Sequence, residues 1–136
     1  MLPGGDSVVS SEADLPKWPE PRTLRPGCFL YEPDAAVIRA DLVGAVARRF
    51  ELAPVDRRIA YLLGDRMISS ALVTPFQVIE VTDFSARKMR AWLAAHDIGR
   101  VEIKTRGFAS RPEELLRHFR LKGRHEAVLF LTRVAG

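Results

Sequence analysis

Residues 101–134, VEIKTRGFASRPEELLRHFRLKGRHEAVLFLTRV, decide the fold class because two strand patterns flank one helix pattern. Val101–Thr105 alternates apolar and charged residues, which predicts a strand with one buried face. Ser110 through Glu113 has the spacing of a capping box, which predicts that a helix begins there. Ala127–Val134 is almost continuously apolar, which predicts a central strand covered on both faces. The order strand, helix, strand indicates a layered sheet with packed helices.

The residues upstream continue this alternation. Three strands are predicted there, at Cys28–Tyr31, Ile59–Leu63 and Phe76–Val81. One helix is predicted over 34–50 and another over 85–96, where Ser85 is the expected N-cap. Gly123 is the expected C′ residue of the third helix, and 66–74 favours no single assignment. The order β-α-β-β-α-β-α-β predicts an α/β fold, with α+β as the alternative, built from a mixed sheet of about five strands and three helices.

Residues 1–27 are predicted to be a linker. They contain five of the nine prolines and three of the nine glycines. Proline neither continues a helix nor donates to a sheet, so only Ser7–Ser10 could form a short strand. Trp18 is expected to dock on the folded body or on a neighbour. We expect the linker to connect a missing N-terminal catalytic domain to one domain formed by 28–136, a length that suits a single domain.

Composition excludes several classes of protein. No apolar run reaches the roughly 18–20 residues of a membrane span, and the polar N-terminus is not a signal peptide. A lone cysteine, Cys28, allows neither an internal disulfide nor a zinc site built from cysteines, and it is expected to be a buried thiol. The three histidines lack metal-ligand spacing. We therefore expect a cytoplasmic protein without a metal.

No catalytic constellation stands out. A nucleotide-type cofactor needs a glycine-rich turn after a strand, and the only adjacent glycines, Gly4 and Gly5, lie in the predicted linker. His125 and Glu126 could form an acid–base pair, but surface residues are the favoured interpretation. We therefore expect that this chain alone is not an enzyme and holds no cofactor.

Charge is distributed unevenly along the sequence. The net charge is +4, but residues 1–84 carry −3 and residues 85–136 carry +7. A strongly basic segment favours a polyanionic partner. The alternative is a solvated surface that is rich in arginine, with charged groups in water and side-chain stems covering apolar surface.

Seven basic residues are the candidate nucleic-acid contacts. Lys104, Arg106 and Lys122 are preferred, because strand and turn positions should hold them outward. Arg87 and Lys88 are secondary, since a phosphate at a helix start would relieve their unfavourable position there. The remaining two are Arg100 and Arg124. Few aromatic residues are interleaved with these cations, which favours recognition of a folded RNA over base stacking on a single strand.

Several phrases of the sequence resemble the THUMP-like domain found at the C-terminus of bacterial class I S-adenosylmethionine-dependent methyltransferases. They are Tyr31–Asp34, Val37–Ala40, Ile59–Leu62, Val101–Gly107, Pro112–Leu115, Leu121–Gly123 and Leu131–Val134, and the resemblance spans about residues 28–136. It implies an accessory domain whose partner is the N-terminal methyltransferase domain of the same protein, where S-adenosylmethionine would bind. By analogy with THUMP domains of RNA-modifying enzymes, it also implies structured RNA as a partner. The alternative is a module that packs on the catalytic domain or mediates dimerisation, with no nucleic-acid role.

Overall fold

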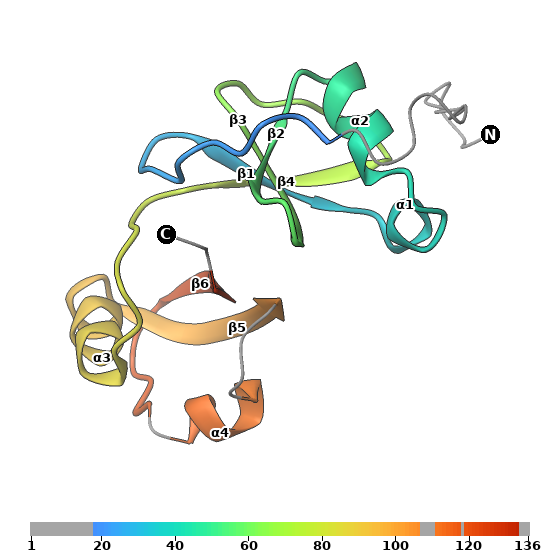
Figure 1. Ribbon diagram of the computed structural model, residues 1–136. Coiled ribbons are helices and arrows are strands. Elements are labelled where there is room, and N and C mark those ends of the chain that lie inside the picture. The colour runs from blue at the N-terminus through green and yellow to red at the C-terminus, as the bar shows by residue number, and fades with distance from the viewer. Residues whose placement is uncertain (1–17, 107–110, 118, 134–136) are drawn as a thin grey trace. The chain divides into compact units, whose positions relative to one another are not determined.

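The computed structural model describes residues 18–106, 111–117 and 119–133, which form α/β structure (Figure 1). The chain divides into two compact units, which we call the N-terminal unit, ending at Val81, and the C-terminal unit, beginning at Thr82. Each unit has its own sheet and its own cluster of buried apolar side chains. The predicted α/β class is confirmed, but the expectation of one mixed sheet of about five strands was wrong, because six strands of the described residues divide between two sheets.

The N-terminal unit is a four-stranded antiparallel sheet in the order β2-β3-β1-β4. Its strands are β1 (Phe29–Pro33), β2 (Ala53–Asp56), β3 (Ile59–Gly64) and β4 (Val73–Gln77). Tyr31 is completely buried, and its hydroxyl donates to the Arg66 carbonyl at 2.6 Å and accepts from the Ile68 N–H at 2.7 Å. Trp18 packs against the same core from a segment without helix or strand. The predicted irregular structure is therefore confirmed for 18–27, whereas Ser7–Ser10 lies outside the described residues.

The predicted helix over 34–50 is two short helices, α1 (Ala35–Arg39) and α2 (Val43–Arg49). Asp34 begins α1 by accepting the Ala36 N–H at 3.0 Å. Asp41, between the helices, has a φ of 57°, a left-handed conformation that ends an α-helix and that aspartate tolerates better than most residues. This break explains why an apolar stripe at helical spacing did not become one helix.

One strand was not predicted, and another differs from its predicted position. The strand that was not predicted is β2, which contains Pro54. An edge strand accommodates this proline because one side of its backbone needs no sheet partner. β4 begins at Val73, three residues before the predicted start, and ends at Gln77. The prediction of a buried strand reaching Val81 was wrong, because Val81 is 37% exposed and lies outside the sheet.

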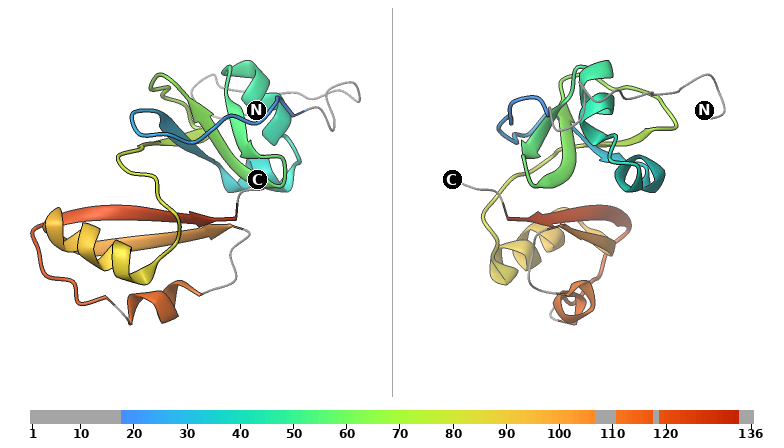
Figure 2. Two further views of the ribbon diagram at one scale, coloured as in Figure 1. Left: turned by 60° about the vertical axis from the view of Figure 1, so that its left-hand side comes forward. Right: turned by 45° about the vertical axis from the view of Figure 1, so that its right-hand side comes forward.

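The C-terminal unit contains α3 (Ala86–Ala95), β5 (Ile98–Arg106), α4 (Pro112–Leu116) and β6 (His125–Thr132). β5 and β6 are parallel, paired from Ile98 with His125 to Arg106 with Thr132. Figure 2 shows both helices on the same face of this two-stranded sheet. The buried side chains between helices and sheet are Leu93, Ile98, Ile103, Leu115, Phe119 and Leu131.

Details of this unit separate the correct predictions from the wrong ones. The predicted cap of α3 is confirmed, since the Ser85 hydroxyl accepts the Lys88 N–H at 3.3 Å. Ser110 lies outside the described residues, and α4 begins with Pro112 in its first turn. The prediction of a central strand near the C-terminus was wrong: within the described residues β6 pairs with β5 alone, and only Leu131 on it is buried. Among the described helices, none is both long and apolar enough to cross a membrane.

Candidate nucleic-acid interface

The uneven charge of the sequence follows the boundary between the two units. The C-terminal unit has 12 basic and 6 acidic residues, a net charge of +6, and the N-terminal unit has 9 and 11, a net charge of −2. The positive charge therefore belongs to one folded unit with its own core. This is the arrangement expected when one part of a protein meets a polyanion.

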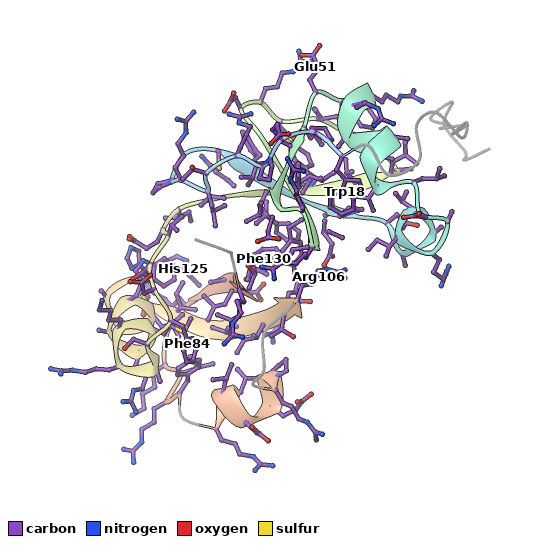
Figure 3. The ribbon with its side chains drawn as sticks, in the orientation of Figure 1. Trp18, Glu51, Phe84, Arg106, His125 and Phe130 are labelled. Carbon is purple, nitrogen blue, oxygen red and sulfur yellow. The ribbon has the colours of Figure 1, made fainter. Side chains whose placement is uncertain are left out.

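Parallel pairing distributes the seven candidate cations over three places. The first place, at or just before the starts of β5 and β6, holds Arg100, Lys122 and Arg124. The second half of β5 holds Lys104 and Arg106, and the first turns of α3 hold Arg87 and Lys88. At about 3.3 Å per residue, the eight residue-to-residue steps from Ile98 to Arg106 span about 26 Å. Figure 3 accordingly shows His125 and Arg106 at opposite ends of the strands. Lys122 therefore does not lie beside Arg106, and the three preferred cations do not form one cluster.

The starts of β5 and β6 are held together by their backbones. A Cβ atom on Gly123 would come within 3.0 Å of the carbonyl groups of Asp97 and Ile98, and one on Gly99 would meet the backbone of Gly123 equally closely. Only glycine permits this approach. The His125 N–H also donates to the Asp97 carbonyl at 2.9 Å. We call this crossing of Asp97–Gly99 with Gly123 the glycine corner. Its Gly123 was predicted to end a helix, but α4 ends at Leu116, and Gly123 serves close packing instead.

The glycine corner carries more positive than negative charge. Arg124 Nε lies 3.1 Å from an Asp97 carboxylate oxygen, and Arg100 Nη1 lies 3.3 Å from Glu126 Oε1. These arginine side chains are 88% and 81% exposed, and exposed ion pairs contribute little stability, so both guanidinium groups can also contact phosphate. Two more exposed cations on the loop before β6 have no ion pair with any described residue: Arg120 and Lys122. With these two loop residues, four cations stand against two carboxylates, so the corner and the loop before β6 together carry net positive charge.

Lys104 and Arg106 lie on the sheet face opposite the helices. The alternation predicted for this strand is confirmed, because Val101 and Ile103 pack toward the helices. The Lys104 side chain is only 24% exposed, and its Nζ lies 3.4 Å from Glu102 Oε1. Arg106 is half-buried beside its register partner Thr132. Both residues are consequently less accessible than the cations of the glycine corner.

Arg87 and Lys88 are exposed in the first turns of α3. No acidic residue lies in that turn, so the helix dipole is opposed by two cations. One backbone donor of the turn, the Lys88 N–H, is already used by Ser85. A phosphate could still meet the remaining N–H groups and the side-chain charges, as sequence reasoning expected.

Sequence reasoning missed Asp97, which orients Arg124 and accepts the His125 N–H. Its φ of 56° is left-handed, and the sequence Asp97-Ile98-Gly99 directly after an amphipathic helix is the signal that could have revealed a tight turn. This turn places Asp97 against Gly123, so a residue outside the basic set positions the basic surface.

The residues considered for catalysis or metal binding have structural contacts instead. Cys28 is buried, as predicted, and its thiol donates to the Arg25 carbonyl at 2.9 Å. The His96 ring stacks on Trp92 with ring centroids 4.2 Å apart. Glu126, considered as an acid–base partner of His125, is in the ion pair with Arg100. Within the described ranges, no three histidine, cysteine, aspartate or glutamate side chains gather as metal ligands would.

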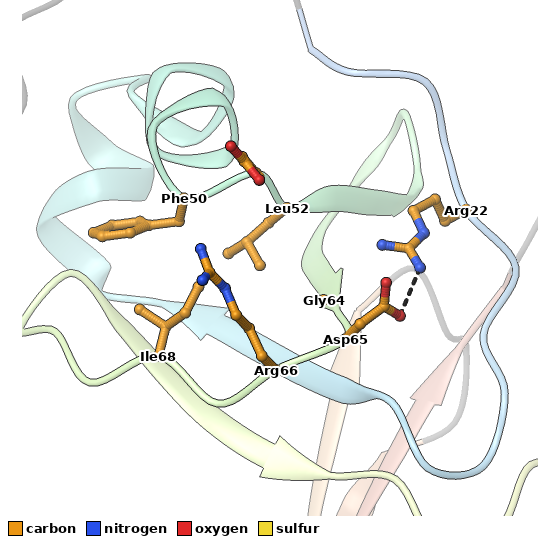
Figure 4. Close-up of a pocket in the computed structure, with 8 residues that line it drawn as sticks. Arg22, Phe50, Leu52, Gly64, Asp65, Arg66 and Ile68 are labelled. Atoms are coloured by element: carbon orange, nitrogen blue, oxygen red, sulfur yellow. Dashed lines mark hydrogen bonds and ion pairs between the residues drawn. The ribbon is translucent and has the colours of Figure 1, made fainter.

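A small cavity of about 200 Å³ lies in the N-terminal unit (Figure 4). Its floor includes Leu52 and Gly64, and one side is closed by the ion pair of Arg22 with Asp65 at 2.8 Å. The hydrogen bond from Arg22 holds the pKa of the Asp65 carboxyl below its usual value. None of the described residues that line this cavity is a histidine, cysteine or serine, so they present no nucleophile–base pair.

Comparisons with known proteins connect both units to methyltransferases. Residues 73–136 match the model of the THUMP domain-like family. Two uncharacterized S-adenosylmethionine-dependent methyltransferases of Mycobacterium tuberculosis, from strains CDC 1551 and H37Rv, are each 38% identical over 135 residues, which cover 98% of this chain and 36% of the relative. The crystal structure of a candidate methyltransferase from Porphyromonas gingivalis W83 has the same fold, with a TM-score of 0.75 at 20% identity over 96% of this chain and 33% of that one. The chain thus spans about a third of the length of these relatives.

Proposed function

Because residues 73–136 match the model of the THUMP domain-like family, we propose that this chain is a non-catalytic accessory part of a longer S-adenosylmethionine-dependent methyltransferase and helps to bind its RNA substrate. S-adenosylmethionine would bind outside this chain, which has no glycine-rich turn after a strand. The single observation that carries the RNA role is the net charge of +6 on the C-terminal unit.

The glycine corner is the proposed centre of the RNA interface. Its backbone crossing fixes the starts of two strands, so the cations attached to them keep a constant spacing. Such cations contact phosphates without reading base sequence. Few aromatic side chains among the described residues are exposed for stacking, so the proposed substrate is a folded RNA recognised through its shape and backbone. Lys104, Arg106, Arg87 and Lys88 would extend the contact away from the corner.

The test is a salt titration of binding to a structured RNA, followed by fluorescence anisotropy. We compare the unaltered chain with Lys122→Ala/Arg124→Gln and with a control that removes two exposed arginines from the N-terminal unit, Arg39→Ala/Arg57→Ala. The corner variant should weaken binding and flatten the plot of log K against log salt by roughly 0.7–0.9 for each phosphate that the variant no longer neutralises. The control should leave the slope nearly unchanged.

Two other outcomes would contradict the proposal, and a third would require a further variant. Equal weakening by both variants would mean that net charge attracts RNA without a site. A loss of binding accompanied by a lower Tm of the C-terminal unit would point to damaged folding, and Lys122→Ala alone would then decide, because Lys122 makes no ion pair with a described residue. Absence of binding at low salt would remove the RNA role.

A further inference from the structure

Exposed apolar side chains are concentrated in one short segment. Four large hydrophobic residues are exposed in the described part of the chain, and three of them lie within six residues: Ile79 at 66%, Val81 at 37% and Phe84 at 45%. The fourth is Met67, in a loop of the N-terminal unit. Isolated exposed hydrophobic residues are common, but clustered ones indicate a contact surface.

The backbone of the same segment is also unsatisfied by the chain itself. The last sheet bonds of β4 are made by Val78, which donates to the Cys28 carbonyl at 2.9 Å and accepts the Gly27 N–H at 2.8 Å. From 79 to 83, no N–H or C=O group takes a hydrogen-bond partner among the described residues. These groups are open to water or to another strand.

The sequence of the segment favours more burial than this chain provides. Its β-branched residues predict a buried strand through Val81, whereas the sheet ends at Gln77. Residues two apart in an extended chain face the same side, which would put Ile79 and Val81 together and Glu80 opposite them. A conflict between local sequence preference and observed exposure is characteristic of functional surfaces.

We propose that residues 79–83 bind an edge strand of the methyltransferase part of the longer protein, which pairs with their backbone and covers Ile79 and Val81. This inference rests on the proposed function, because it takes the partner to be the remainder of a methyltransferase. The relatives provide that remainder, since this chain matches only about a third of their length. Strand addition uses backbone hydrogen bonds for affinity and alternate side chains for specificity.

Charge further defines the partner strand. Glu80 and Asp83 are exposed and have no ion pair in the described part of the chain. In an extended segment Asp83 would share the side of Ile79 and Val81, and Glu80 would face the other side, so a strand paired with the segment would have one carboxylate beside it on each face. We therefore assign it an apolar strand flanked by lysine or arginine, since opposite charges at an interface favour the correct partner.

Amide hydrogen exchange tests this docking directly. Every second amide of 79–83, those that face the partner strand, should exchange at least tenfold more slowly in the longer protein than in the 136-residue chain. Equal exchange rates would overturn the docking. Two separate measurements test the proposed function: binding of S-adenosylmethionine by the longer protein and binding of RNA by this chain. Failure of the proposed function is thereby distinguished from failure of the docking, which amide exchange alone reports. A gene that encodes no methyltransferase part would overturn both.

A matched pair of variants tests the apolar contact. Ile79→Ser/Val81→Ser should lower the Tm of the 136-residue chain only slightly, because Ile79 is 66% and Val81 37% exposed there, and should abolish the exchange protection in the longer protein. The control, Met67→Ser, replaces an equally exposed side chain outside the segment and should preserve the protection. Retained protection in the double variant, or equal loss in the control, would refute the proposed contact.

Discussion

Replacing Gly123 with alanine should destabilise the C-terminal unit more than its single methyl group suggests. The new Cβ would come within 3.0 Å of three backbone atoms: the Asp97 carbonyl carbon and oxygen and the Ile98 carbonyl carbon. Backbone atoms cannot rotate away as a side chain does, so the two strand starts must separate. Overpacking of this kind costs about 1–3 kcal/mol, and loss of the hydrogen bond from His125 to Asp97 adds about 1 kcal/mol. The expected total is about 2–4 kcal/mol.

Each unit contains one described tryptophan, which allows the effect to be localised. Trp92 packs on the C-terminal core, and Trp18 packs on the N-terminal core. In a Trp18→Phe background, only Trp92 reports unfolding, and Gly123→Ala should lower the urea midpoint of its fluorescence. In a Trp92→Phe background, only Trp18 reports unfolding, and Gly123→Ala should leave its urea midpoint nearly unchanged. Lys122→Ala, one residue away and exposed, is the control and should shift neither transition. An unchanged Trp92 midpoint in Gly123→Ala would refute the steric argument.

Three further outcomes are expected from the same structure. Tyr31→Phe should destabilise the N-terminal unit by about 1–3 kcal/mol, because it removes both hydrogen bonds of a buried hydroxyl; the Trp18 transition in urea measures this. Burial raises the pKa of Tyr31 in the folded protein above its value of about 10 in the unfolded chain. The protonated hydroxyl should therefore contribute its full stability below about pH 10, and this contribution should be lost as pH rises through the folded pKa. Urea midpoints measured against pH should consequently fall less at alkaline pH in Tyr31→Phe than in the unaltered chain. The 136-residue chain should bind S-adenosylmethionine no better than an unrelated protein does, and saturable micromolar binding in titration calorimetry would contradict the proposed division of roles.

Local sequence patterns predicted the elements whose determinants are local. Ser85 accepts a hydrogen bond at the start of its own helix, and the alternation of Val101–Thr105 matches one buried face. The prediction of one helix over 34–50 was wrong at Asp41, which has a left-handed backbone conformation. The apolar stripe continues past this residue, so hydrophobic periodicity alone does not reveal the break. The strand reaching Val81 failed because burial requires a covering element, and apolar composition does not supply one.

The candidate interface was predictable in composition but not in arrangement. Counting charges identified the basic half of the chain, and that half is a separate unit. The grouping of Lys122 with Arg106 depended on which strand ends are neighbours, and only the parallel register of β5 with β6 determines that. The glycine corner depends on contacts between residues more than 20 positions apart, such as Asp97 with Gly123, which no local spacing reveals.

Pro75 has a consequence for aggregation. Val78 directs its backbone toward β1, and pairing in β4 alternates, so the nitrogen of Pro75 faces the outer edge of the sheet. This edge therefore lacks a donor in the middle of β4, and a second copy of the chain cannot pair along its whole length. Strand addition is thereby restricted to the segment after Gln77, where a specific partner is proposed. The proline thus protects a chain that exposes Ile79 and Val81 from pairing indiscriminately with itself.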